Sequence, residues 1–168
     1  DDDNAAGETA AFRIAAPGYA ERIVTATALD DDIGRNLALA AGVATIRGAR
    51  ASQAAQVIDG VHNSAANYGW TIWTNLAAPG TFTLDLKATA TVSRVRVLNW
   101  DWTHQAHRYA IETSPDGATW TSLADASGGE HHGWEEWTAP ERQVRYVKFT
   151  GLSNSANQGV MVSELEVY

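Results

Sequence analysis

The chain contains no cysteine, which excludes a disulfide framework, a thiolate zinc site and a cysteine nucleophile. Lysine is scarce, with only Lys87 and Lys148 in 168 residues, and no basic run occurs. Because binding to nucleic acid or anionic membranes is driven by clustered lysine and arginine, the sequence argues against both partners. The uncharged apolar run between Arg35 and Arg47 covers 11 residues, which is too short to span a bilayer.

The acidic charge of the chain is concentrated near its beginning. Residues 1–34 carry two arginines and eight acidic residues, a net charge of −6, whereas residues 35–168 carry ten basic and twelve acidic residues, a net of −2. We therefore expect residues 1–34 to form an acidic linker or a docked extra strand, and residues 35–168 to form the main domain. For residues 19–29 the sequence leaves both a strand and a helix open.

Hydrophobic residues repeat with a period of two from residue 81 onward. Phe82, Leu84 and Leu86, for example, alternate with Thr83 and Asp85, which indicates half-buried strands. Turn signals separate these runs at residues 78–80, 114–117, 127–129 and 139–141. Short strands at regular spacing, without a long helical pattern, predict an all-β sandwich.

Three local elements can be placed more closely. The sequence Ser114-Pro-Asp-Gly117 predicts a hairpin turn that joins a strand over 108–114 to a strand over 119–124. Val43 to Ile46 reads as a strand, and residues 50–57 read as a short helical turn leading into Ile58-Asp59-Gly60.

The aromatic residues cluster in one stretch of the chain. All seven tryptophans lie between residues 70 and 137, and all five histidines lie between residues 62 and 132. One or two tryptophans would serve the core of a domain of this size, so some are expected to face a ligand. The alternative is that these rings fill an irregular β-core.

Several motifs occur in the order found in a known family. They are Asn36-Leu-Ala-Leu-Ala40, Val57-Ile-Asp-Gly60, Phe82-Thr-Leu-Asp-Leu86, Tyr109-Ala-Ile-Glu-Thr-Ser-Pro-Asp-Gly-Ala-Thr-Trp120, Val144-Arg-Tyr-Val-Lys-Phe-Thr-Gly151 and Val162-Ser-Glu-Leu-Glu-Val-Tyr168. Over residues 36–168 the chain resembles the discoidin, or coagulation factor 5/8 type C, domain and the family 32 carbohydrate-binding modules that share its fold. Lys87 stands where this family usually has glycine.

The resemblance implies a discoidin-like jelly-roll β-sandwich of about eight antiparallel strands, with residues 36–40 opening as the first strand. It implies that loops at one end form the binding site, namely 61–75, 99–107, 127–137 and 153–160. These loops hold six of the seven tryptophans and all five histidines. Trp120 is the exception, because the family motif places it in the core.

A sugar is held by an aromatic ring under its apolar face and by planar polar groups on its hydroxyls. The stretch from Asn99 to Arg108 supplies both kinds of group within ten residues. We therefore predict a carbohydrate site formed by Trp73, Trp100, Asp101, Trp102, His104, His107, Arg108, Trp134 and Asn157. The alternative for this stretch is a packed tryptophan beside a structural Asp101–Arg108 ion pair.

Metal binding and catalysis are alternative roles for the histidines and acids of these loops. His104 and His107 with Asp101 have the spacing of two zinc ligands, but zinc requires three or four well-aimed groups. The acidic loop around Glu135 suggests glycoside hydrolysis only weakly, because nothing in it marks a proton-donating carboxyl group. The resemblance implies a structural calcium ion held by Asp59, Asn63 and Glu164 together with loop carbonyl oxygens.

The sequence therefore predicts a non-catalytic carbohydrate-binding module that binds an oligo- or polysaccharide. We expect it to belong to a secreted or periplasmic bacterial enzyme acting on polysaccharides, and to be covalently linked to that catalytic domain. The alternative is a discoidin-type protein-interaction or adhesion domain that uses the same loops. A small hydrolase is a third reading, but the chain lacks Gly-x-Ser-x-Gly, His-Glu-x-x-His and a P-loop.

Overall fold

The computed structural model describes residues 9–14, 22–27, 34–47, 51–62, 73–75, 79–100, 104–156 and 159–168. The chain divides into two compact units, residues 1–35 and residues 36–168, and each is described by itself. None of the helices in these described ranges has the length and apolar character needed to cross a membrane.

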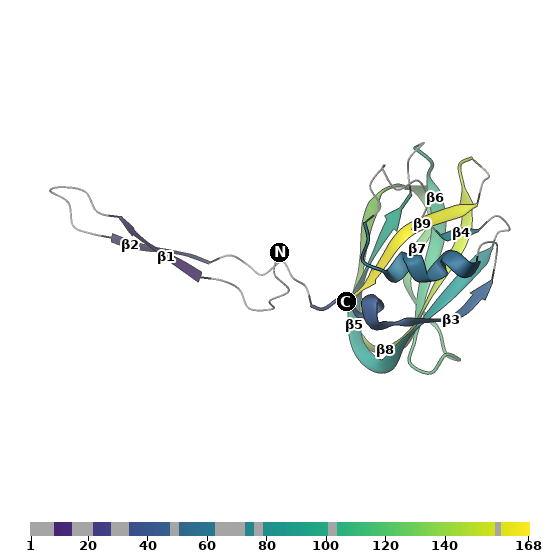
Figure 1. The fold of residues 1–168 in the computed structure, drawn as a ribbon, viewed down its shortest axis with the longest axis horizontal. Coiled ribbons are helices and arrows are strands. Elements are labelled where there is room, and N and C mark those ends of the chain that lie inside the picture. The colour runs from purple at the N-terminus through teal and green to yellow at the C-terminus, as the bar shows by residue number, and fades with distance from the viewer. Residues whose placement is uncertain are drawn as a thin grey trace. The chain divides into compact units, whose positions relative to one another are not determined.

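The first unit contains a two-stranded antiparallel hairpin of β1 (Thr9–Ile14) and β2 (Arg22–Thr27) (Figure 1). The segment for which the sequence left strand and helix open therefore holds a strand. Phe12 pairs with Val24, so these two side chains share one face of the ribbon. Phe12, Ile14, Ile23 and Val24 are all exposed.

The second unit is an antiparallel β-sandwich, as the sequence predicted. Its described strands are β3 (Gly42–Arg47), β4 (Trp73–Asn75), β5 (Gly80–Asn99), β6 (His107–Ser114), β7 (Thr121–His131), β8 (Trp134–Asn154) and β9 (Val160–Val167). Two 3-10 helices, η1 (Leu37–Ala40) and η2 (Ala51–Ile58), precede most of the strands. The strand order is β4-β9-β5-β8-β6-β7, with β3 paired to β5 (Figure 1).

The long strands β5 and β8 take part in both layers. The first half of β5 pairs with β3 and with the second half of β8, which also pairs with β6. The second half of β5 pairs with β9 and with the first half of β8. The register between β5 and β8 shifts after Asp85 and again after Val92, where the two strands pass from one layer to the other.

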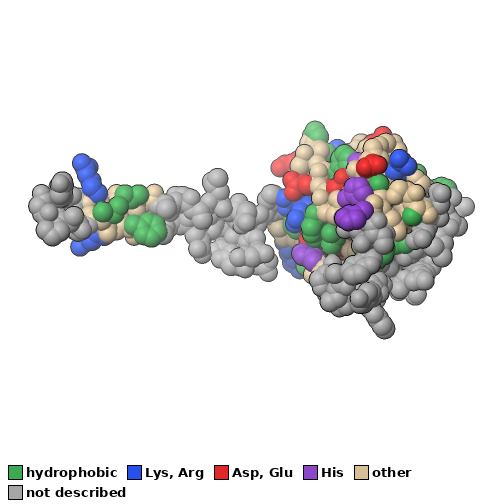
Figure 2. Space-filling model, turned by 90° about the horizontal axis from the view of Figure 1, so that it is seen from above, with side chains coloured by type: hydrophobic (Ala, Val, Ile, Leu, Met, Phe, Trp, Pro, Cys, Tyr) green, Lys and Arg blue, Asp and Glu red, His purple; other side chains and the backbone are tan. Residues whose placement is uncertain are grey.

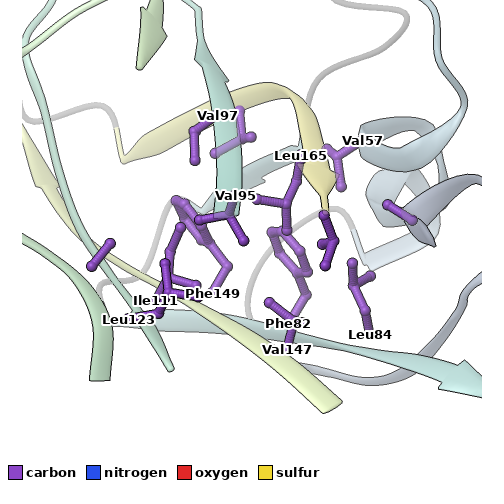
Figure 3. Close-up of a cluster of buried hydrophobic side chains, with 14 of the residues drawn as sticks. Val57, Phe82, Leu84, Val95, Val97, Ile111, Leu123, Val147, Phe149 and Leu165 are labelled. Atoms are coloured by element: carbon purple, nitrogen blue, oxygen red, sulfur yellow. The ribbon is translucent and has the colours of Figure 1, made fainter. Parts of the chain in front are cut away.

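The core lies between these layers. Phe149 of β8 stacks on Phe82 and on Tyr109, with ring centroids 5.2 and 5.1 Å apart. Figure 3 shows Val95 and Leu165 of the other layer facing these rings. Val57 of η2 is completely buried, so this short helix closes one side of the core. Most of the sandwich is held by such non-directional burial of apolar area.

The predicted hairpin at Ser114–Gly117 is confirmed, because β6 and β7 pair across it. The Ser114 hydroxyl accepts hydrogen bonds from the backbone amides of Asp116 and Gly117, at 3.3 and 2.8 Å. The Asp116 carboxylate accepts from the backbone amides of Ala118 and Thr119. These hydrogen bonds lower the pKa of Asp116 to about 2, and the two backbone amides contribute most.

The predicted turns at 127–129 and 139–141 are wrong, because β7 and β8 run through them. Pro140 lies where the pairing of β8 with β5 is interrupted, between Thr138 and Arg142, so its missing N–H removes no ladder bond. The glycines at 128–129 and Pro140 therefore lie at irregular points inside β7 and β8. The described residues of the second unit hold seven strands, which agrees with the sandwich of about eight strands that was expected.

Two expectations from the family motifs also need correction. Residues 36–40 were expected to open the first strand, but Leu37–Ala40 form η1, whose N-cap Asn36 accepts from the Ala38 amide at 3.0 Å. Trp120 was expected in the core, but it is only half-buried, with the Lys148 ammonium 4.2 Å from its ring centroid. The predictions of a strand at 43–46 and a helical turn at 50–57 are confirmed by β3 and η2.

The beginning and end of the second unit are tied together. The Asn36 side-chain oxygen accepts a hydrogen bond from the Val167 backbone amide at 3.1 Å, across 131 residues of sequence. Tyr168 pairs with Arg94 through backbone bonds in both directions, at 2.8 and 3.0 Å. The first and last residues of the sandwich therefore leave it at the same corner.

Candidate functional site

Some predicted site residues lie outside the part of the chain that the structure describes. These are Asp101, Trp102 and Asn157 of the expected sugar site and Asn63 of the expected calcium site. For Trp73 the described feature is its strand position, paired with Val162 of β9. Their roles stay predictions.

His107 occupies a different environment from the predicted one. It is 0% exposed, its Nε2 lies 2.7 Å from the carbonyl oxygen of Trp100, and its Nδ1 accepts from the Met161 amide at 3.4 Å. Both ring nitrogens are therefore used by the backbone. The prediction that His107 contacts a ligand is wrong, because this side chain is buried and joins Trp100 to Met161 inside the sandwich.

Other polar groups fix the neighbouring residues Gln105 and Ala106. The Asn154 side-chain amide donates to the Gln105 side-chain oxygen at 2.7 Å, and both residues are buried. The Ala106 amide donates to the Ser155 hydroxyl at 3.0 Å. His104 precedes this anchored stretch, is exposed, and has a φ of +55°, a left-handed value uncommon for a residue other than glycine.

Trp134, the first residue of β8, is the exposed tryptophan among those whose side chains the structure describes. It is 37% exposed, whereas Trp100, Trp120 and Trp137 are half-buried. The Arg96 guanidinium lies over its ring, 4.5 Å from the centroid. The His62 ring approaches the indole nearly perpendicularly, with centroids 5.0 Å apart and an interplanar angle of 83°.

A buried carboxylate connects the two groups that contact this indole. Glu166 Oε2 lies 2.9 Å from Arg96 Nη1, and Oε1 lies 3.1 Å from His62 Nε2. The Tyr168 hydroxyl also donates to Oε2, at 3.1 Å. We call Trp134, Arg96, His62 and Glu166 the Trp134 platform.

The structure does not bring all predicted sugar ligands together. Arg108 lies between the buried residues His107 and Tyr109, so its side chain points outward from the layer that contains β6. Glu135 is partly buried and faces the core. Its neighbour Trp134 therefore points outward, away from the layer of β5 and β9. Arg108 and Trp134 therefore lie on opposite outer faces of the sandwich.

A polar network that the sequence did not predict joins the two layers. The Tyr109 hydroxyl donates to Glu135 Oε2 at 2.5 Å and accepts from Trp137 Nε1 at 3.0 Å. The same carboxylate accepts from the Asn99 side-chain amide at 3.1 Å and lies 2.6 Å from His131 Nδ1. Burial first, and then the bond to Glu135, raise the pKa of Tyr109 well above its ordinary value.

In Figure 2, histidine and acidic side chains lie close together on the described surface of the sandwich. Each Glu135 oxygen has a hydrogen-bond donor or a histidine ring within 3.1 Å, so this carboxylate of β8 connects to side chains on β5, β6 and β7.

The residues expected to hold calcium include one buried carboxylate with a free oxygen. Glu164 is completely buried, its Oε1 accepts from the Gly60 amide at 3.2 Å, and its Oε2 has no hydrogen-bond partner. Burial raises its pKa to about 8, opposed by the Gly60 bond and assisted by the charges of Asp59 and Glu166. An orphaned buried carboxylate oxygen beside a second carboxylate fits a hard cation.

That fit is partial within the described residues. The structure shows no group of three or more His, Asp or Glu side chains there that is arranged around an ion. Asp59 is exposed, and one of its oxygens accepts from the Val61 amide at 2.8 Å. A calcium site would therefore need further oxygens from the segment that follows His62.

The chain matches the model of the F5/8 type C domain over residues 44–165. It is 25% identical to BTB/POZ domain-containing protein 9 from Bos taurus over 114 residues, which are 62% of this chain and 19% of that protein. The chain thus spans about a fifth of the length of the curated relatives it matches.

Two solved structures are similar over most of their own length. CpGH89CBM32-6 from Clostridium perfringens has a TM-score of 0.65 and 24% identity, and covers 80% of this chain and 98% of its own. Chitosan-binding module 1, derived from the chitosanase/glucanase of Paenibacillus sp. IK-5, has a TM-score of 0.62, 25% identity and the same two coverages. The chain belongs to the F5/8 type C domain family.

Proposed function

We propose that this domain is a non-catalytic carbohydrate-binding module, and that a sugar ring stacks on Trp134. The observation that carries the proposal is the exposed indole with a guanidinium against its ring. An aromatic face flanked by a few fixed polar groups suits a ligand with apolar C–H faces and hydroxyl groups. The likeness to chitosan-binding module 1 supports the same function.

The loop residues remain part of the proposal. Trp73, Trp100, Asp101, Trp102, His104, Arg108 and Asn157 are the predicted contacts at the loop end, with His107 now assigned to the loop interior. Because Arg108 and Trp134 point outward from different layers, a single small sugar does not reach both. A longer oligosaccharide, or two separate sugars, would be needed to occupy both places.

We also propose that the module directs a secreted or periplasmic bacterial enzyme to its polysaccharide. The support is that chitosan-binding module 1 derives from a chitosanase/glucanase. A calcium ion at Asp59, Asn63 and Glu164 would supply a fixed positive charge beside Glu164, and its role would be structural stability.

The test is a binding screen with a cationic, an anionic and several neutral polysaccharides, with and without calcium. Chitosan, alginate, a β-glucan and a galactan serve as probes, and tryptophan fluorescence follows titration of the best one. We expect saturable binding that weakens at least about tenfold in Trp134→Ala. Trp120→Ala is the matched control, because Trp120 lies beside Lys148, outside the Trp134 platform.

Binding that Trp134→Ala leaves unchanged, with Trp102→Ala abolishing it, would move the site to the 99–107 loop. Binding to none of the glycans would contradict the proposal and favour the discoidin-type protein-interaction alternative. Release of chromophore from nitrophenyl glycosides by the purified domain would contradict a non-catalytic role.

A further inference from the structure

We propose that Glu166 is a positioning residue for Trp134, acting through Arg96 and His62. This inference rests on the proposed function, because it explains how the ring that stacks on a sugar is held. Glu166 lies on β9, two residues from the end of the chain, and was not among the predicted site residues.

Glu166 is a buried carboxylate. It is 4% exposed, so it does not reach a ligand on the surface. Its two carboxylate oxygens point to different partners, Oε2 to the Arg96 guanidinium at 2.9 Å and Oε1 to His62 Nε2 at 3.1 Å. Hydrogen bonds of this length to a buried, charged acceptor are among the stronger ones in proteins.

Both partners of Glu166 contact the Trp134 ring. Arg96 covers one face of the Trp134 indole, and His62 meets its edge. The side chains of Arg96 and His62 are 34% and 55% exposed, so without an anchor each would sample several rotamers. A single carboxylate therefore fixes two mobile neighbours, and through them the orientation of the indole.

A fixed orientation of the Trp134 ring favours ligand binding. Fixing an aromatic side chain before the ligand arrives lowers the entropy that is lost on binding. Arg96 also lies near a second carboxylate, because Glu136 Oε2 is 3.9 Å from its Nε and 3.0 Å from Arg94 Nη1. Among the described residues Glu136 forms no hydrogen bond or ion pair with His62, so Glu166 is the carboxylate that links the face and the edge of the ring.

Three variants separate positioning from a merely structural effect. Glu166→Met keeps the length of the side chain and removes both anchors. Glu166→Gln keeps both, since its oxygen accepts from Arg96 while its amide donates to a His62 ring protonated on Nδ1. Tyr168→Phe removes the third bond to the carboxylate and leaves both anchors in place, so it is the matched control.

The readout that does not depend on a ligand is fluorine NMR of protein labelled with 5-fluorotryptophan. Trp134→Phe identifies the Trp134 resonance among the seven. We expect one narrow Trp134 signal in the wild type, Glu166→Gln and Tyr168→Phe, and a shifted or broadened signal in Glu166→Met. The signals of the other six tryptophans should stay in place, and thermal unfolding should confirm that each variant is folded.

The second readout is affinity for the best polysaccharide of the screen. Glu166→Met should weaken binding about tenfold, whereas Glu166→Gln and Tyr168→Phe should stay within about threefold of the wild type. If Glu166→Met leaves the Trp134 signal unchanged, the inference is overturned. If it moves the signal but wild-type protein binds none of the probes, the positioning role holds and the proposed function fails.

Discussion

Glu164 offers a quantitative test of how a buried carboxyl group limits the stability of the calcium-free domain. Burial raises its pKa from 4.5 to about 8, with smaller contributions from Asp59 and Glu166. At about 1.4 kcal/mol for each pKa unit, this rise corresponds to about 5 kcal/mol of unfolding free energy. That is a large part of the total stability of a typical domain, about 5–15 kcal/mol.

The sign follows from where the proton is held. Between pH 4.5 and about 8 the folded protein keeps the Glu164 proton that the unfolded chain releases. The contribution of the Glu164 proton to the free energy of unfolding is therefore fully present below pH 4.5. It falls as the pH rises and is lost above about pH 8. In Glu164→Gln the side chain has no proton to lose, and its oxygen still accepts from the Gly60 amide.

The assay is urea unfolding of both proteins in chelator at a series of pH values. We expect the stability of the wild type, relative to Glu164→Gln, to fall by up to about 5 kcal/mol between about pH 4 and about pH 8.5. A difference that does not change with pH would refute the reasoning. Adding calcium near pH 8 should restore the wild type and not the variant, and equal responses would contradict the proposed calcium site alone.

Two further substitutions test the fold. Lys87 has a φ of +70°, so Lys87→Gly should raise the free energy of unfolding by about 0.5–1 kcal/mol, whereas Ala88→Gly should lower it. A loss of stability in Lys87→Gly would contradict the strain argument. Tyr109→Phe should lower the free energy of unfolding by about 1–3 kcal/mol, because the substitution leaves Trp137 Nε1 without its acceptor. Tyr146→Phe is the control, and an equal effect of both variants on urea midpoints would contradict the role of the network.

The strands and the main hairpin could be predicted because their signals are local. Alternation of apolar and polar residues gives the strand faces directly, and Ser114-Pro-Asp-Gly117 contains all of its own turn chemistry. Lys87 adds an instructive case. It stands where the family usually has glycine, and its positive φ shows what backbone shape that glycine would serve.

The continuous course of β7 and β8 could not be predicted in the same way. The glycines at 128–129 and Pro140 have the composition of turns, and whether a chain reverses there depends on its pairing partners. Pro140 is tolerated because the β5–β8 register is already interrupted around it. Register is a property of two strands far apart in sequence, so one strand's residues do not reveal it.

The candidate site shows the same division. Trp134 was predicted from its ring type and its neighbours, but Arg96, His62 and Glu166 were not. Arg96 and His62 lie 70 and 104 residues from Glu166 in sequence. The pairing of β5 with β9 brings Arg96 beside Glu166, whereas His62 follows η2, which packs against β9. The prediction for His107 was wrong because the sequence does not distinguish a histidine that is bonded to backbone groups from one that binds a ligand.

The bond between the Asn36 side chain and the Val167 amide has a consequence for the connectivity of the fold. Because the two ends of the sandwich meet at one corner, the order in which its strands are synthesised is not essential to their arrangement in space. A short bridge from Tyr168 to Asn36, with new ends at the exposed Asp116–Gly117 turn, would give a circular permutant with the same core. The sandwich can equally be inserted into a surface loop of another protein, because its first and last residues lie close enough together to join two neighbouring positions of that loop.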